Sequence, residues 1–271
     1  MVVGGRMNQE WPLVLFRKSV MKQQKFSHIV DLLGETHGLH CLDLGSDNGV
    51  ISYMLRRKGG NWKSADLDEA SVRAIRDVVQ RDVFLIDGLR TAFEDNEFDR
   101  VVIVDFLEHI ETDNAFVREL YRIIRPGGEL IVNVPHARPT ILRKVRHALG
   151  QTDEKHGHVR PGYTVDSLTM LLKDTFSILR YRSYSKFFTE VVDTLLTFAM
   201  DRTHTGRISS RKGRVVVGDD VGRSRKAFGL YSMIYPIVWG FAKLDTLLFW
   251  CGGYALACKA VSNKRQSEGT G

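Results

Sequence analysis

Carboxylates and small residues are combined in the stretch Cys41-Leu-Asp-Leu-Gly-Ser-Asp-Asn-Gly-Val50, which offers ligand groups at a sharp turn. The apolar run Leu39–Leu44 predicts a buried strand, and Gly45 permits the tight turn into the helix that follows. In open α/β sheets, ligands bind at the carboxyl ends of strands, beside such turns. The stretch therefore predicts a ligand site whose charge comes from Asp43 and Asp47.

A nucleotide-type cofactor suits this turn, and charge separates the candidate cofactors. A dinucleotide fingerprint needs glycine at positions 45, 47 and 50, whereas this chain has Asp47 and Val50. Because the Asp47 carboxylate would repel a pyrophosphate, a nicotinamide oxidoreductase is disfavoured. S-adenosylmethionine has no phosphate and carries an ammonium and a sulfonium group, which nearby carboxylates tolerate or favour. The charge pattern therefore indicates S-adenosylmethionine.

Short apolar runs alternate with amphipathic stretches on both sides of this turn, which is the pattern of a parallel sheet covered by helices. The expected strands are Leu39–Leu44, Trp62–Ala65, Val83–Ile86, Arg100–Asp105 and Glu129–Val134. The expected helices are Val50–Arg57, Ala70–Gln80 with Asp68 as N-cap, and Asn114–Arg125, preceded by one or two amphipathic helices within residues 11–33. The carboxyl ends of the strands would meet at one edge, where a ligand can bind.

The alternation of strands and helices changes after residue 135. The expected elements of this half are, in order, a basic loop (138–162), a capped helix (Thr164–Leu172), a strand (Phe176–Tyr184), a helix (Phe187–Met200), a second basic loop (201–226) and a last strand (Gly252–Val261). The two strands are candidates to complete the sheet. The other segments after residue 135, which are helical or basic, predict an elaboration outside the sheet.

Charge is distributed unevenly over the 271 residues, whose formal net charge is +7. Residues 1–135 hold 17 basic and 21 acidic side chains, whereas residues 136–271 hold 22 basic and 11 acidic ones. Basic residues concentrate in 202–226, and seven aromatic residues follow in 228–250. This composition is typical of an interfacial membrane segment. The alternative is a solvated loop before a core helix, and nucleic acid is the least favoured partner because no RNA-binding module is recognisable.

Sequence signals of secretion or membrane insertion are weak. Residues 1–10 lack the basic and apolar regions of a secretory signal. The longest uncharged run, Ala227–Ala242, has 16 residues, short of the about 20 that span a bilayer. Three scattered cysteines suit neither a disulfide framework nor a zinc site. We therefore expect a cytoplasmic protein that contacts the inner membrane face peripherally through residues 201–250.

Five motifs in order resemble those of the class I S-adenosylmethionine-dependent methyltransferases: CLDLGSDNG, SADLD, LIDGLRTAFEDNEFD, VVIVDFLEHI and RIIRPGGELIVNVP. The resemblance covers residues 38–135 and extends weakly to about residue 185. It implies a doubly wound, Rossmann-like α/β sheet, mostly parallel with an antiparallel last strand, and a basic and aromatic helical elaboration at the C-terminal end. We expect an N-terminal helical segment (1–36), the cofactor-binding core (37–185), and an insertion with the closing strand (186–271).

The same resemblance implies S-adenosylmethionine as cofactor and assigns residues to it. Asp66 would hold the ribose hydroxyls, Asp87 would accept from the adenine amino group, and the Leu89 backbone would contact the ring. One departure is Asp47, which stands where the family usually has glycine. The cofactor-binding residues expected are Asp43, Gly45, Ser46, Asp47, Asn48, Gly49, Asp66, Leu67, Asp87, Gly88, Leu89 and Asp105.

Methyl transfer to a hydroxyl needs a proton acceptor that works near neutral pH, and histidine is the usual choice. His109 and His136 follow the fourth and fifth expected strands, and His158 lies in the loop beyond. Each is a candidate base, and each has the alternative of packing or fixing a loop. Asp105 with Glu108 and His109 forms the pattern D-x-x-E-H, which resembles a metal-binding pattern of some quinone-biosynthesis O-methyltransferases. We expect a structural role for it, and no metal.

The sequence thus predicts a methyltransferase that acts on a small or lipid-linked acceptor, with oxygen as the expected target. Residues 201–250 would bring it to the cytoplasmic membrane face. One alternative is an RNA or protein methyltransferase that uses the basic C-terminal arm. Another is a scaffold that binds the cofactor without catalysis.

Overall fold

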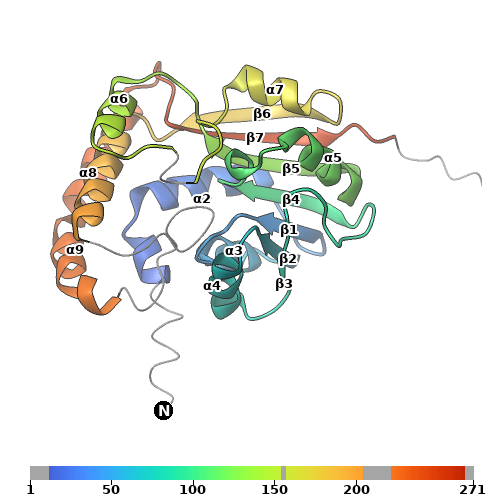
Figure 1. Cartoon of the computed structure of the whole chain (residues 1–271), viewed down its shortest axis with the longest axis horizontal. Helices are drawn as coiled ribbons and strands as arrows, with labels where there is room; N and C mark the ends of the chain where they lie inside the picture. Colours follow the sequence, from blue (N-terminus) through green and yellow to red (C-terminus); the bar gives the residue numbers. More distant parts are fainter. Residues whose placement is uncertain (1–11, 154–156, 204–220, 266–271) are drawn as a thin grey trace, which may run out of the picture.

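The computed structural model describes residues 12–153, 157–203 and 221–265. Within these residues, strands form one sheet in the order β3-β2-β1-β4-β5-β7-β6 (Figure 1). The strands are β1 (His40–Leu44), β2 (Asn61–Asp66), β3 (Val83–Leu85), β4 (Phe98–Val104), β5 (Ile124–Pro135), β6 (Phe176–Tyr184) and β7 (Ala255–Ser262). The helices include α2 (Val20–Leu33), α3 (Val50–Arg56), α4 (Glu69–Val79), α5 (Asp113–Ile123), α6 (Ile141–Ala148), α7 (Val165–Leu172), α8 (Phe187–Thr203) and α9 (Val221–Lys243). Two short 3-10 turns are η1 (Leu107–His109) and η4 (Leu244–Leu247).

The predicted antiparallel strand is confirmed, and it lies inside the sheet. β7 pairs antiparallel with β5 on one side and with β6 on the other. β6 therefore runs in the same direction as β5, although the two do not touch. Because β1, β2, β3, β4 and β5 pair in parallel, the carboxyl ends of all strands except β7 meet at one edge. This edge is where the predicted site residues lie.

The apolar strand β4 shows why the sheet has helices on both faces. Val101 and Ile103 belong to the core cluster that includes Phe116 of α5. Val102 and Val104 point the other way, into the cluster that includes residues of α2 and α3. A strand buried on both faces has no polar side to alternate with. The doubly wound α/β fold predicted from the sequence is therefore confirmed.

Helix caps follow the sequence closely in the first part of the core. The Asp68 side chain accepts from the backbone N–H of Ser71 (2.9 Å) at the start of α4, as predicted. Thr164 and Ser167 form a reciprocal capping box at the start of α7. Each of these residues satisfies a backbone donor that has no partner within its helix.

The prediction of a loop over residues 138–162 is wrong for Ile141–Ala148, which form α6. Thr140 caps this helix by accepting from the N–H of Arg143 (3.0 Å). Arg146 is its buried residue, while Ile141 is exposed. Ile141, Leu142 and Val145 have the spacing of one helix face. The basic residues between them favoured the interpretation as a loop.

The prediction of a loop over residues 201–226 is also wrong at both ends. α8 continues to Thr203, and α9 already begins at Val221. The segment between them lies outside the described residues, as do most of the basic side chains predicted there. α6, α8 and α9 stack beyond the end of the sheet at which β4 and β5 finish (Figure 1).

Candidate active site

Asp43 at the end of β1 is fully buried and organises the turn that follows. Its carboxylate accepts hydrogen bonds from the hydroxyls of Ser46 (2.7 Å), Ser52 (2.6 Å) and Ser64 (2.7 Å). Burial raises the pKa of Asp43, while the three hydroxyls act in the opposite direction. Asp43 thus ties the turn to α3 and β2, so it acts as a positioning residue for the predicted cofactor site.

We expect Asp43→Ala to lower the free energy of unfolding by about 3 kcal/mol, because a buried hydroxyl without its partner costs roughly 1–3 kcal/mol and some hydroxyls can find new partners. Urea denaturation followed by circular dichroism measures this change. Asp77→Ala, which removes an exposed carboxylate, is the matched control and should change stability little. A loss below about 1 kcal/mol for Asp43→Ala would contradict the positioning role.

The turn itself requires left-handed backbone at several positions. Gly45, Asp47 and Gly49 have φ values of 91°, 47° and 76°. A Cβ atom at Gly49 would lie 2.8 Å from the Cα of Ile75 in α4. Gly49 therefore permits the close approach of α3 to α4, a role in addition to the expected one at the cofactor. Ser46 and Asn48 are buried within the turn.

Two further carboxylates follow the next strands along the sheet. Asp66 ends β2, is fully buried, and accepts from the N–H of Leu67 (2.7 Å). Asp87, after β3, accepts from the N–H groups of Leu89 (2.8 Å) and Arg90 (3.0 Å). These two backbone bonds lower the pKa of Asp87. The structure thus places Asp47, Asp66 and Asp87 after β1, β2 and β3, and the binding of ribose by Asp66 and of adenine by Asp87 stays a prediction.

Asp105, directly after β4, is held by a lysine that the sequence reasoning missed. Lys25 of α2 forms an ion pair with Asp105, and the Asn133 side-chain amide donates to the other carboxylate oxygen (2.9 Å). The Tyr184 hydroxyl donates in turn to Asn133. Burial lowers the pKa of Lys25, but the charge and hydrogen bond of Asp105, together with the charges of Asp47 and Glu108, raise this pKa overall. The network connects α2 with the ends of β4, β5 and β6.

The spacing of residues in α2 contains a pattern that could have identified Lys25 as a site residue. Lys22 and Lys25 precede the buried residues Ile29 and Leu32 with spacings of three, four and three residues. Such spacing places all four on one face of a helix. Two lysines in line with core positions indicate that the buried face of α2 ends at a site that needs positive charge.

These residues fit S-adenosylmethionine, which is zwitterionic. Carboxylates at the ends of β1, β2 and β3 suit its ammonium and ribose groups, and Lys22 and Lys25 suit its carboxylate. Burial lowers the pKa of Lys22, whereas the charge of Asp47 opposes that change, so Lys22 lies close to the predicted turn. When bound, this cofactor supplies a methyl group that its sulfonium already activates.

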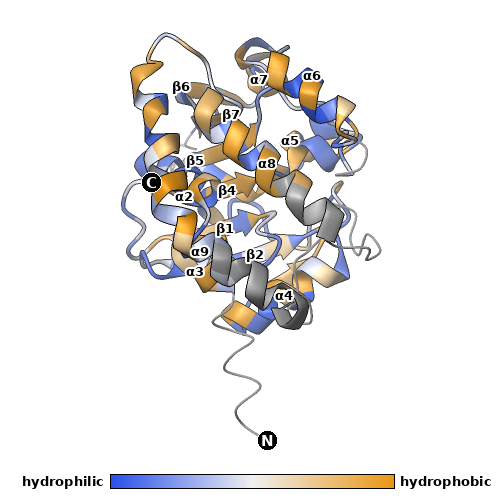
Figure 2. Cartoon of the chain, turned by 90° about the vertical axis from the view of Figure 1, so that its left-hand side faces the viewer, coloured by the Kyte–Doolittle hydropathy of each residue, from blue (hydrophilic) through white to orange (hydrophobic). Residues whose placement is uncertain are grey.

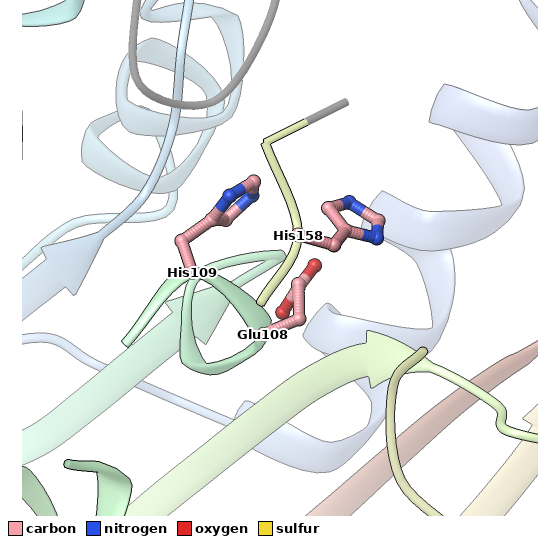
Figure 3. A group of neighbouring side chains, drawn as sticks. All are labelled: Glu108, His109 and His158. Carbon is pink, nitrogen blue, oxygen red and sulfur yellow. The ribbon is translucent and has the colours of Figure 1, made fainter. Parts of the chain in front are cut away.

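Two of the three predicted catalytic histidines come together. His109 lies in η1 and His158 in the loop before α7, and their rings meet edge to face with centroids 4.9 Å apart (Figure 3). The buried Glu108 completes the group, whose potential ligand atoms all lie within 4.8 Å of one another. His109 Nδ1 lies 2.9 Å from the Gly157 carbonyl. Because a carbonyl only accepts, Nδ1 carries the proton, and Nε2 is left as the basic nitrogen.

The expectation of no metal at this group remains a prediction. Two imidazoles and one carboxylate are ligands that a zinc ion accepts. The structure does not assemble the D-x-x-E-H residues as one set, because Asp105 is bound to Lys25 and Asn133. The same groups can instead transfer a proton, since a carboxylate beside an imidazole favours its protonated form.

His136 occupies a different place, at the end of β5. Its backbone N–H donates to the Tyr254 carbonyl oxygen (2.7 Å), and its ring nitrogen Nδ1 lies 3.0 Å from the Gly253 carbonyl oxygen. These contacts fix His136 against the segment that leads into β7. They also put the proton on Nδ1 and leave Nε2 as a base.

Burial lowers the pKa of His136, against the opposing effect of the Gly253 contact. We therefore expect this imidazole to titrate below 6.5 in the folded protein, measured by NMR on the full chain. The unfolded chain then binds the proton more tightly, so His136 should reduce stability as the pH falls below 6.5. A titration midpoint above 6.5 would contradict the burial argument.

Comparison with known proteins agrees with the fold and with the motif order. Residues 42–132 match the family model described as a methyltransferase domain. The core of this chain is a class I S-adenosylmethionine-dependent methyltransferase domain. The predicted family and its cofactor, S-adenosylmethionine, are thus confirmed.

Curated proteins match about two fifths of the chain or less. The chain is 37% identical over 93 residues to a demethylmenaquinone methyltransferase of Corynebacterium urealyticum, covering 34% of this chain and 39% of that protein. It is 24% identical over 108 residues to a ubiquinone biosynthesis O-methyltransferase of Pseudomonas aeruginosa, covering 38% and 47%. The chain therefore spans less than half the length of these relatives.

Solved structures share the fold over most of the chain. A putative methyltransferase from Bacillus halodurans has a TM-score of 0.55 at 14% identity, covering 88% of this chain and 98% of that protein. The 4+2 cyclase SpnF has a TM-score of 0.56 at 18% identity, covering 89% and 80%. Since one of these proteins is described as a cyclase, the fold alone does not decide the reaction.

Proposed function

We propose that this protein transfers a methyl group from S-adenosylmethionine to an oxygen atom of a hydrophobic acceptor held at a membrane surface. The observation that carries the proposal is a set of exposed apolar side chains at the end of α9 and beyond it, here called the apolar surface. It consists of Met233, Ile237, Leu247, Phe249 and Trp250, whose exposed fractions are 78%, 74%, 63%, 81% and 68%.

The apolar surface lies on the outside of a helix whose inner side is fixed. The Tyr231 hydroxyl donates to the Lys18 carbonyl (2.7 Å), and Gln23 donates to the Tyr235 hydroxyl (2.7 Å). The buried Asp245 accepts from the N–H groups of Lys186 and Phe188 at the start of α8 (2.8 Å each). These contacts hold α9 and η4 beside the site edge, with Met233 and Ile237 turned outward.

Single exposed apolar residues are ordinary, whereas a group of large ones marks an interaction surface. Figure 2 shows many hydrophobic residues on α8 and on the described part of α9, on the side beyond the strand ends. Trp and Phe are residues that favour the membrane interface. No helix in the described parts of the chain is long and apolar enough to cross a bilayer. A peripheral membrane contact is the interpretation that these side chains support.

Relatives named for quinones support a hydrophobic acceptor, and the one named a ubiquinone biosynthesis O-methyltransferase supports oxygen as the target. The chain must then align that oxygen and remove its proton. His158, beside Glu108 and His109, is the base we propose, because its imidazole lies with a carboxylate at the end of β4, next to Asp105. His136 is the second candidate base.

The test is incubation of the purified full chain with methyl-labelled S-adenosylmethionine and a bacterial lipid extract. We expect the label to enter the organic phase. Parallel reactions contain total RNA or a protein lysate freed of lipid. Transfer to RNA or protein alone would contradict the proposal, and S-adenosylhomocysteine binding without transfer to any fraction would favour the scaffold alternative.

A further inference from the structure

A cavity of about 490 Å³ lies beside α6, directly after His136 in the chain. Four basic side chains line it together with apolar groups: Arg138, Arg143, Lys144 and His147, with Pro139 and Pro161 among the apolar ones. The cavity lies at the site edge, because the segment that forms it begins where β5 ends. It is therefore placed to hold a part of the acceptor that does not react.

The charge of this cavity is not balanced by neighbouring carboxylates. Asp153 binds Arg143 (2.7 Å) and lies 3.6 Å from His147 Nε2. Arg138 and Lys144 form no ion pair within the described part of the chain, and both are exposed. The Glu190 carboxylate accepts from the lining hydroxyl of Thr140 (3.5 Å) and interacts with Arg143. With histidine neutral, the lining keeps a charge of about +1 after Asp153 and Glu190 are counted. Such a surface attracts an anion.

The cavity adjoins the apolar surface through Arg138. A Cβ atom built on Gly252 would lie 1.7 Å from Nη1 of Arg138, so the guanidinium lies against this glycine. Gly252 follows Trp250 of the apolar surface by two residues. A ligand with a charged group and a long apolar part can therefore place the first on the lining cations and the second on the apolar surface.

We propose that the cavity beside α6 binds a phosphate group carried by a lipid acceptor. This inference rests on the proposed function and adds that the acceptor is a phosphorylated lipid. Arg138 and Lys144 supply donors for the phosphate oxygens, and the two prolines leave the remaining wall apolar. Arginine and lysine are the side chains that bind phosphate most directly.

The test uses calorimetry on the full chain with farnesyl phosphate, farnesol and inorganic phosphate as probes. We expect farnesyl phosphate to bind at least about tenfold more tightly than either farnesol or inorganic phosphate, because it alone offers both parts. Equal affinity for farnesol, or equal affinity for inorganic phosphate, would overturn the proposal. Calorimetry without S-adenosylmethionine measures binding alone, so the result is independent of whether methyl transfer occurs.

A double variant, R138A with K144A, assigns the binding to this cavity. Each basic residue near an anionic lipid group changes affinity by roughly fivefold, so we expect about 25-fold weaker farnesyl phosphate binding. Arg73→Ala with Lys173→Ala removes two charges elsewhere on the surface and should leave binding unchanged. S-adenosylhomocysteine affinity checks that the variants are folded. Wild-type affinity for farnesyl phosphate in a folded double variant would overturn the assignment.

Discussion

His158→Ala should reduce methyl transfer to the lipid fraction by about 10²–10⁴-fold, the usual contribution of a general base. The imidazole lies with Glu108 and His109 at the end of β4, where it can accept the proton that leaves the acceptor hydroxyl. His158 does not belong to the set of carboxylate and lysine residues that suit the cofactor. Affinity for S-adenosylhomocysteine, measured by calorimetry, should therefore stay within about twofold, since no cofactor contact is removed.

Two controls make this prediction specific to a base. His37→Ala removes an exposed histidine that precedes β1, at the opposite end of the strands from the group, and should keep full transfer. Removal of divalent ions with a chelator should also leave transfer unchanged, which tests the expectation that Glu108, His109 and His158 hold no metal. Full transfer by folded His158→Ala, together with loss of transfer in His136→Ala, would move the role to His136. Loss with the chelator and recovery with zinc would replace proton transfer at this group by metal binding.

The parts of the fold that the sequence predicts well are those in which local pattern and burial agree. The run Val101–Val104 is apolar throughout because β4 faces a core on both sides. Asp68 marks the start of α4 because its side chain satisfies a backbone donor there. The antiparallel last strand also followed from the family resemblance. In these cases, each residue's role depends on neighbours close in the chain or on simple burial.

The parts that were missed depend on contacts between distant segments. The sequence did not reveal that the Asp43 carboxylate accepts from three serine hydroxyls, one of which comes from β2, while its expected place in the cofactor site stays a prediction. The ion pair of Lys25 with Asp105 joins residues 80 positions apart. α6 is different, because Ile141, Leu142 and Val145 do have helical spacing and the basic residues between them hid the signal. Tertiary contacts of this kind leave only indirect signals, such as lysines at core positions of α2.

Phe249→Ser with Trp250→Ser should weaken binding to vesicles by about 100-fold. Both side chains are exposed, with rings in edge-to-face contact and centroids 4.7 Å apart. Burial of one large apolar side chain contributes roughly 1.5–3 kcal/mol. Losing most of this burial free energy at two residues changes the partition coefficient between vesicles and water by about two orders of magnitude, since 1.4 kcal/mol corresponds to a tenfold change. Flotation with vesicles of phosphatidylcholine and phosphatidylglycerol at physiological salt measures the binding.

The matched control separates a membrane contact from a general loss of apolar area. Met170→Ser with Leu179→Ser removes two side chains that are 61% and 58% exposed on α7 and β6, on the side of the molecule away from α9 (Figure 1). If vesicle binding depended on overall hydrophobicity, both double variants would bind vesicles equally weakly. If electrostatic attraction through basic residues were sufficient, neither pair would weaken it, and high salt alone would release the protein. A selective loss with the first pair requires the apolar surface to enter the lipid, which places the site edge and the cavity beside α6 against the bilayer.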